Sequence, residues 1–317
     1  MHKTFSGNDA AVYEAVSGKM FLCIFCFMFN RRAHGKCERE DNMPQKNRER
    51  NIAIVLSAGR GSRMHTGQPK QYLELCGRPV IAWPLQAFEE FDGIDDVILV
   101  SAEEDIEYCR NDIVNRYGFS KVRSVVAGGA ERYLSVWQGL KEAARILYES
   151  AVSGEINGIV HRADSQSGSD ADGTSESGAG ERPQGYESYI MIHDGARPMI
   201  DGEILGRALN DVREHGACVV GMPVKDTIKV ADDDGFAADT PPRSRLWQIQ
   251  TPQTFSFPLV YEAYRRLIED GVTDVTDDAM VVERRRRTKV KLTVGSYRNL
   301  KITTPEDLEI ARMLMQR

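Results

Sequence analysis

The sequence IAIVLS at residues 52–57, followed by AGRGSRM at 58–64 and QPK at 68–70, decides the fold. The first six residues are apolar and rich in β-branched side chains, which predicts a buried strand. The strand breaks directly into a loop with glycines, and glycine lets backbone N–H groups approach a ligand closely. Because Arg63 and Lys70 accompany the loop, it also has cations that neutralise phosphate. The stretch therefore predicts a phosphate-binding loop at the end of a strand.

Two common nucleotide-binding motifs do not match this loop. A P-loop needs four residues between its glycines and then Gly-Lys-Ser/Thr, and that string is absent. The dinucleotide fingerprint Gly-x-Gly-x-x-Gly is satisfied only by Gly59 and Gly61, because Met64 stands where the third glycine allows close helix packing. The alternative to a phosphate site is an ordinary strand–turn–helix junction.

Beyond this loop, segments typical of strands alternate with segments typical of helices. We expect strands at 96–101, 122–126, 189–193 and 217–221, and helices at 106–117, 131–147 and 204–212. Such alternation favours an α/β fold: a Rossmann-like, mostly parallel sheet with helices on both faces. The loops at 58–70, 127–132 and 194–198 follow strand carboxyl ends, where ligands of parallel sheets bind.

Three stretches depart from this alternation. Residues 163–185 are rich in Ser, Gly, Asp and Glu, which predicts a disordered low-complexity insertion. Residues 223–246 contain prolines and the turn sequence DDDG, which predicts a β-arm projecting from the sheet. Residues 1–46 are interpreted as an N-terminal extension or as a mis-called start upstream of Met43. A single domain over 47–317 is expected.

Composition limits the possible partners and compartment. The net charge of −6 gives no overall basic field for nucleic acid. The apolar run at 20–29 is too short to span a bilayer, so no membrane is expected. Scattered cysteines suit a reducing cytoplasm. Cys23, Cys26, His34 and Cys37 leave a zinc knuckle as a minor alternative, although the spacing is short.

Several strings, taken in order, resemble the 2-C-methyl-D-erythritol 4-phosphate cytidylyltransferase family of the non-mevalonate isoprenoid pathway. The resemblance covers about residues 50–315. Its strings are SAGRGSRM at 57–64, PKQY at 69–72, GG at 128–129 with Arg132 and Ser135, HDGARP at 193–198, PVKDT at 223–227, LW at 246–247, TPQ at 251–253, TD at 276–277, and NLK at 299–301 before PED at 305–307. The family usually has alanine at Gly195 and often an acidic residue at Ala130.

The resemblance implies transfer of CMP from CTP to a polyol phosphate, with loss of pyrophosphate. A phosphomonoester has a second pKa of about 6 and is largely dianionic at neutral pH, so its oxygen needs no general base. Catalysis then consists of positioning two anions and stabilising the transition state with cations. By resemblance, Arg63 and Lys70 stabilise the transition state, and Arg243 and Lys301 position the methylerythritol phosphate. Arg245 is the competing assignment for Arg243.

The resemblance also assigns the binding residues. The CTP site is expected to use Ser57, Ala58, Gly59, Gly61, Gly128, Gly129, Arg132 and Ser135. The polyol phosphate site is expected to use Asp194, Arg197, Asp226, Thr227, Thr251 and Thr276. Asp194 is also the candidate Mg²⁺ ligand, with capping of the next turn as the alternative. His193 is interpreted as a packed strand residue, and 284–287 as a solvated loop.

In the family, the arm reaches into a second subunit, so a homodimer with a shared site is expected. Three other functions stay open. A ribitol 5-phosphate cytidylyltransferase shares most of these strings. A sugar nucleotidyltransferase would use UTP or dTTP instead. A non-catalytic nucleotide-binding module would bind CTP without releasing pyrophosphate.

Overall fold

The core of the protein is one seven-stranded sheet in the order β11-β7-β10-β6-β1-β4-β5. The computed structural model describes residues 49–59, 68–152, 188–286 and 288–316. The strands of the sheet are β1 (Ile52–Ser57), β4 (Asp96–Ser101), β5 (Val122–Ala127), β6 (Tyr189–Asp194), β7 (Ala217–Pro223), β10 (Trp247–Ser256) and β11 (Lys291–Val294). Only β10 runs antiparallel to its neighbours, β6 and β7. The expected mostly parallel α/β sheet is confirmed.

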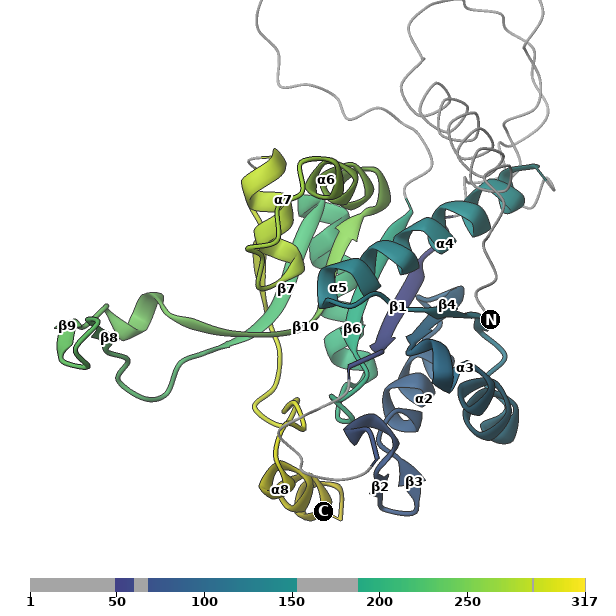
Figure 1. Ribbon diagram of the computed structural model, residues 1–317, viewed down its shortest axis with the longest axis horizontal. Coiled ribbons are helices and arrows are strands. Elements are labelled where there is room, and N and C mark those ends of the chain that lie inside the picture. Colours follow the sequence, from purple (N-terminus) through teal and green to yellow (C-terminus); the bar gives the residue numbers. More distant parts are fainter. Residues whose placement is uncertain (1–48, 60–67, 153–187, 287, 317) are drawn as a thin grey trace, which may run out of the picture. The chain divides into compact units, whose positions relative to one another are not determined.

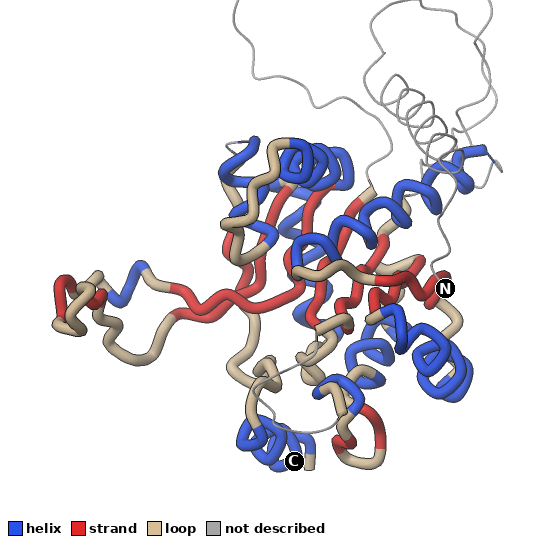
Figure 2. The backbone as a smooth tube through the Cα atoms, in the orientation of Figure 1, coloured by secondary structure: helices blue, strands red, loops and turns tan. Residues whose placement is uncertain are grey.

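Helices connect most of these strands, as the tube in Figure 2 shows. They are α2 (Ala82–Glu90), α3 (Ile106–Tyr108) with a π-helical turn (Cys109–Asn115), α4 (Arg132–Val152), α5 (Gly202–His215), α6 (Phe257–Glu269), α7 (Asp278–Arg286) and α8 (Pro305–Met315). Three short 3-10 helices lie at Lys70–Tyr72, Glu103–Asp105 and Arg243–Arg245, and a small hairpin joins β2 (Glu74–Leu75) to β3 (Arg78–Pro79).

The central strands are buried because helices cover both faces of the sheet. Alternate side chains such as Val55 and Leu99 pack with α2 and α5 in one hydrophobic cluster. On the opposite face, a Cβ atom at Gly139 of α4 would lie 2.6 Å from Ile54 Cγ2 and 3.3 Å from Val100 Cγ2. Since α4 lies this close to β1 and β4, only glycine fits at that point of the helix.

Each strand and helix that the sequence analysis expected has a counterpart in the structure. The elements that the sequence analysis missed are β2, β3, β10, β11, α2, α6, α7 and α8. The interpretation of 284–287 as a loop is wrong for residues 284–286, because α7 runs through Arg286. Arg284 is exposed and donates to the Asp274 carbonyl oxygen over 2.6 Å, so its side chain is solvated but its backbone is helical. Residue 287 lies outside the described residues.

The arm between β7 and β10 extends away from the sheet (Figure 1). Near its tip, β8 (Val230–Ala231) pairs antiparallel with β9 (Ala237–Asp239). The Asp232 carboxylate closes the turn by accepting hydrogen bonds from the backbone of Asp234 and Phe236. Large apolar side chains are exposed on this arm, with Phe236 at 72%.

One compact unit, Glu49–Ile146 with Glu187–Arg317, holds the whole sheet. The predicted extension at 1–46, the predicted insertion at 163–185 and the four residues of the zinc alternative lie outside the described residues. No helix within the described residues is long and apolar enough to cross a membrane.

Candidate active site

Two of the expected loops, those after β1 and β5, meet the first turn of α4 at the carboxyl edge of the sheet. A Cβ atom at Gly128, just after β5, would lie 2.6 Å from the Ala58 Cβ and 2.8 Å from the Ser135 Oγ. The Ser135 hydroxyl oxygen accepts from the Gly129 N–H over 3.1 Å. Because Gly128 has no side chain, the loop after β1, the loop after β5 and the first turn of α4 touch one another. The structure thus brings together four residues of the predicted CTP site.

The residues after β1 are anchored by the short helix Lys70–Tyr72. The buried Gln71 amide donates to the Ser57 carbonyl oxygen over 2.6 Å. The Ser57 and Tyr72 hydroxyls lie 3.1 Å apart. These contacts tie Lys70 to the carboxyl end of β1, where the sequence analysis expected it. Gly61 and Arg63 lie outside the described residues.

Asp194, the last residue of β6, is surrounded by three cations. Its Oδ2 lies 2.9 Å from Lys301 Nζ and 3.6 Å from Arg197 Nε, and its Oδ1 lies 3.5 Å from Arg132 Nε. Burial alone would raise the pKa of this carboxyl, but Arg132, Lys301 and Arg197 outweigh it and hold the pKa well below its usual range. Asp194 is therefore ionised at neutral pH. We call these four residues the Asp194 cluster.

Arg132 connects the Asp194 cluster to α7. Its two terminal nitrogens each donate over 2.8 Å to one carboxylate oxygen of Asp278, which is completely buried. The Tyr264 hydroxyl donates to the same carboxylate over 2.5 Å. Burial opposes the charge of the guanidinium, but Asp278 and Asp194 raise the pKa of Arg132 well above its usual value. Arg132 is thus a permanently charged group fixed in a bidentate pair.

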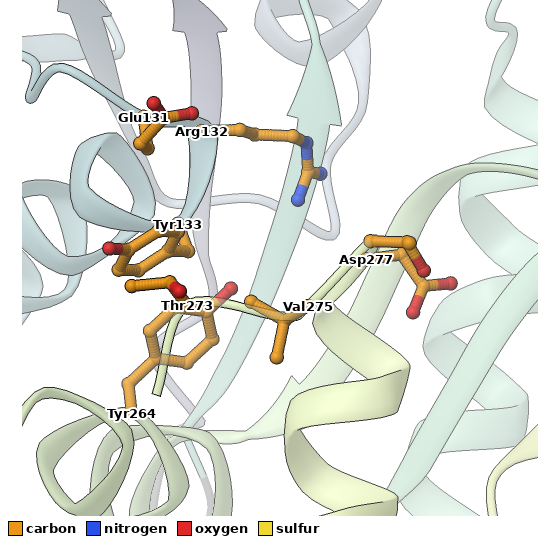
Figure 3. Close-up of a pocket in the computed structure, with 8 residues that line it drawn as sticks. Glu131, Arg132, Tyr133, Tyr264, Thr273, Val275 and Asp277 are labelled. Carbon is orange, nitrogen blue, oxygen red and sulfur yellow. The ribbon is translucent and has the colours of Figure 1, made fainter. Parts of the chain in front are cut away.

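A cavity of about 350 Å³ lies beside Arg132 (Figure 3). The start of α4, Tyr264 of α6 and the α6–α7 connection line it, including the predicted substrate residue Thr276. Thr276 is exposed, and its hydroxyl lies 3.5 Å from Met280 Sδ. A larger cavity of about 800 Å³, between α2, the start of α5 and the end of α8, contains none of the predicted site residues.

Asn299 links the remaining members of the site. Its carbonyl oxygen accepts from Arg197 Nη1 over 2.9 Å, and its side-chain amide donates to the Thr251 carbonyl oxygen over 2.9 Å. The Thr251 hydroxyl accepts from the Asp194 N–H over 3.1 Å. These bonds hold β6, β10 and the segment before Lys301 in one arrangement.

The predicted residues of the arm lie apart from this cluster within one chain. Asp226, Thr227 and Arg243 are exposed. Arg243 Nη1 donates to the Lys225 carbonyl oxygen over 2.9 Å, at the base of the arm. Among the described residues, none of these three forms a hydrogen bond or ion pair with the Asp194 cluster. Arg245 is exposed as well, so exposure does not separate the two arginine assignments.

Sequence reasoning missed two residues of the site. Asp278 stands next to the quoted string TD, but its partner Arg132 is 146 positions away, so no local pattern links them. Asn299 was quoted in a string without a role. It is completely buried and bonded to three backbone or side-chain groups, a placement that only the folded structure reveals.

Comparison with known protein families matches the part of the chain that contains these site residues. The profile of the IspD family, 2-C-methyl-D-erythritol 4-phosphate cytidylyltransferase, matches residues 51–150 and 179–317. The chain belongs to this family. The gap between the matched ranges overlaps the predicted insertion. The resemblance stated from the sequence is confirmed.

Individual members of the cytidylyltransferase family cover most of the chain. The enzyme of that name from Lachnospira eligens is 45% identical over 267 residues, which are 84% of this chain and 99% of the relative. The one from Caldanaerobacter subterraneus is 37% identical, over 84% of this chain and 98% of the relative. The crystal structure of 4-diphosphocytidyl-2C-methyl-D-erythritol synthase from Anaerococcus prevotii is 30% identical, with a TM-score of 0.62 over 85% of this chain and 99% of that one.

Proposed function

We propose that this protein transfers CMP from CTP to 2-C-methyl-D-erythritol 4-phosphate, forming 4-diphosphocytidyl-2-C-methyl-D-erythritol and pyrophosphate for isoprenoid precursor synthesis. The observation that carries the proposal is the Asp194 cluster, which gathers three cations at the carboxyl end of β6 beside the loop after β1. Family membership indicates which substrates bind. The three cations of the cluster would hold two anionic substrates close together.

The chemistry of the transfer suits this set of residues. A dianionic phosphomonoester attacks the α-phosphorus of CTP with an oxygen that carries no proton, so no base has to remove one. The barrier comes from bringing a dianion to a tetra-anion, and fixed cations lower it. Lys301 and Arg197 lie within 4 Å of Asp194 and are held by their surroundings, so their charges need little rearrangement.

The CTP side of the site comprises the loops after β1 and β5. Ser57, Ala58, Gly59 and Gly61 would offer backbone N–H groups to the triphosphate, with Arg63 and Lys70 stabilising the transition state. Gly128 and Gly129 would offer backbone groups to the cytosine edge, where an amino donor distinguishes it from uracil. The contact of Gly128 with Ala58 supports one continuous site. In this arrangement Ser135 acts by holding Gly129.

The polyol phosphate side is completed by a second subunit. Asp194, Arg197, Thr251, Thr276 and Lys301 belong to one chain, whereas Asp226, Thr227 and Arg243 would come from the partner's arm. The exposure of Ile228, Val230 and Phe236 supports a homodimer, because apolar side chains on a projecting arm are typical of an interface. An arginine on the arm suits bidentate phosphate binding.

Magnesium fits the site as a partner of the triphosphate. The described residues contain no group of three or more His, Cys, Asp or Glu side chains that would hold a metal by themselves. Mg²⁺ commonly uses one or two carboxylates together with substrate phosphates and waters. The ionised Asp194 would meet that need through Oδ1, which lies 3.5 Å from Arg132 Nε. The ion would neutralise phosphate charge and orient the triphosphate.

The cytoplasm is the proposed compartment. Among the described residues, Cys76 is an exposed free thiol and Cys109 and Cys218 are buried free thiols. Free thiols are typical of a reducing compartment.

Pyrophosphate release tests the function directly. The purified protein is incubated with CTP, Mg²⁺ and either methylerythritol phosphate or ribitol 5-phosphate. We expect faster turnover with methylerythritol phosphate. Faster turnover with ribitol 5-phosphate would assign the other polyol, and CTP binding without release in either case would assign a binding module.

Two further conditions extend the assay. Replacing CTP with UTP or dTTP tests the base, and we expect only CTP to support release. Adding EDTA and then restoring Mg²⁺ tests the metal, and we expect activity to disappear and return. Activity that survives EDTA would contradict the magnesium proposal and leave the transfer itself standing.

A further inference from the structure

His193 lies next to the Asp194 cluster but is not one of its four residues. It is completely buried, one residue before Asp194 on β6. Its Nδ1 lies 3.0 Å from the Thr251 hydroxyl, and its Nε2 lies 3.2 Å from the Arg197 carbonyl oxygen. Both ring nitrogens therefore contact residues that belong to the candidate site.

The direction of each hydrogen bond follows from the partners. The Arg197 carbonyl oxygen can only accept, so His193 Nε2 carries the ring proton and donates it. Nδ1 is then an acceptor, and the Thr251 hydroxyl must donate to it. The Thr251 oxygen in turn accepts from the Asp194 N–H. One continuous chain runs from the Asp194 N–H through Thr251 and His193 to the Arg197 carbonyl.

This chain fixes both ends of the turn that follows β6. The Arg197 N–H donates to the Asp194 carbonyl oxygen over 3.0 Å, which closes the turn from within. The series of hydrogen bonds through Thr251 and His193 links the two ends of this turn a second time, and the Thr251 hydroxyl and both His193 ring nitrogens each have a partner. The two side chains that leave the turn, Asp194 and Arg197, are therefore held relative to each other.

We infer that His193 is a positioning residue, which sets the orientation of Asp194 and Arg197 through Thr251 and thereby governs how the polyol phosphate is held. This inference rests on the proposed function. Thr251 acts in this account through the backbone of Asp194, since its hydroxyl already makes one donated and one accepted bond in the interior.

The state of the ring at neutral pH agrees with this geometry. Burial lowers the pKa of His193 to about 4, so the ring is neutral and Nδ1 keeps its acceptor lone pair. The charged groups facing it are Asp194 and Arg197, and Phe88 of α2 packs edge-on with a centroid distance of 5.6 Å. A side chain needed only for packing would be replaceable by phenylalanine, which offers the same ring shape.

Two substitutions separate positioning from packing. His193→Phe keeps the ring volume and removes both hydrogen bonds, so we expect kcat/KM for the polyol phosphate to fall by about 10- to 100-fold. His193→Asn restores an acceptor for Thr251 and should recover part of that loss. In both variants the KM for CTP should change less than the KM for the polyol phosphate. Thermal unfolding and circular dichroism establish that each variant is folded.

A double-mutant cycle tests whether His193 acts through Thr251. Thr251→Val removes the hydroxyl, and Thr251→Ala removes it as well if the valine variant folds poorly. Thr254→Val is the matched control, because Thr254 is on the same strand, is also buried and pairs with Met191 of β6. We expect Thr251→Val and His193→Phe to be strongly non-additive, and Thr254→Val to leave activity close to wild type.

The outcomes are distinct from those of the functional test. If the wild-type protein releases no pyrophosphate with any polyol phosphate, the proposed function fails before any variant is compared. If the wild type is active and His193→Phe matches it, the inference is overturned. Additive effects of the Thr251 and His193 substitutions would also overturn it, because Thr251 would then act on the substrate independently.

Discussion

The Asp194 cluster and the arm differ in how their charges are held. Asp194 and Arg197 have side chains that are 11% exposed; Asp194 faces three cations, and Arg197 contacts Asp194 and the Asn299 carbonyl oxygen. Asp226, Thr227 and Arg243 lie on the exposed arm, where the Arg243 side chain donates to the Lys225 carbonyl oxygen. The comparison teaches that folding of one chain preorganises one half of the proposed site, whereas the other half would be placed by the proposed partner subunit. Stability and activity should therefore respond differently in the two regions.

Asp278→Asn should give the largest change in stability, because it leaves Arg132 with an unneutralised charge in the interior. Breaking a buried ion pair typically costs about 3–5 kcal/mol, and Asp278 is completely buried. We expect a loss near the lower end, since Asp194 still faces Arg132. Urea denaturation measures the change in unfolding free energy. An unchanged midpoint would mean that the Asp278–Arg132 pair does not stabilise the region.

Acidification should destabilise the interior through His193. The pKa in the folded protein is about 4 and that of an unfolded histidine is about 6.5, so stability is present above pH 6.5 and declines as the pH falls to 4. The limit of this contribution is about 3 kcal/mol. Urea denaturation at pH 7 and pH 4.5 should show a smaller decline in His193→Asn than in the wild type. Equal declines in both proteins would refute the assignment to His193.

Lys301→Met removes the cation nearest Asp194 and should lower kcat by about 100-fold, as loss of a fixed transition-state donor commonly does. Lys301 is partly exposed, so the melting temperature should change little. Lys291→Met, on the exposed face of β11, is the matched control and should keep full activity. Initial rates of pyrophosphate release at saturating CTP provide the measurement.

Arg243→Met should reduce activity by about tenfold with no loss of stability, because the side chain is exposed. Arg245→Met serves as its comparison, and the arginine with the larger loss is the one that binds phosphate. Mixing Arg243→Met with Lys301→Met under conditions of subunit exchange should restore about a quarter of wild-type activity, because mixed dimers contain one intact site. Failure of any mixture to recover activity would refute a site shared between subunits.

The parts of the site that sequence reasoning found are those that parallel-sheet rules place. Ala58, Gly128 and Asp194 each follow the carboxyl end of a strand, and such ends share one edge, so their proximity could be predicted. The parts that it missed depend on pairing across long separations. β10 was missed because it is antiparallel and its sequence WQIQTPQTFS is polar and contains a proline. α7 was missed because DAMVVERRR reads as a charged loop, although its apolar residues Val281 and Val282 are completely buried.

β10 runs from the base of the arm past the site, and its pairing with β7 is irregular between Ile249 and Gln253. Trp247 pairs with Pro223 where the arm leaves the sheet, Thr251 contacts His193, and Gln253 accepts from the first two N–H groups of α7. One stretch of backbone therefore joins the base of the arm to the residues that contact His193 and α7. If the proposed second subunit binds the arm, it binds the same strand that carries Thr251 and Gln253, so dimer formation and alignment of the site would be coupled through β10.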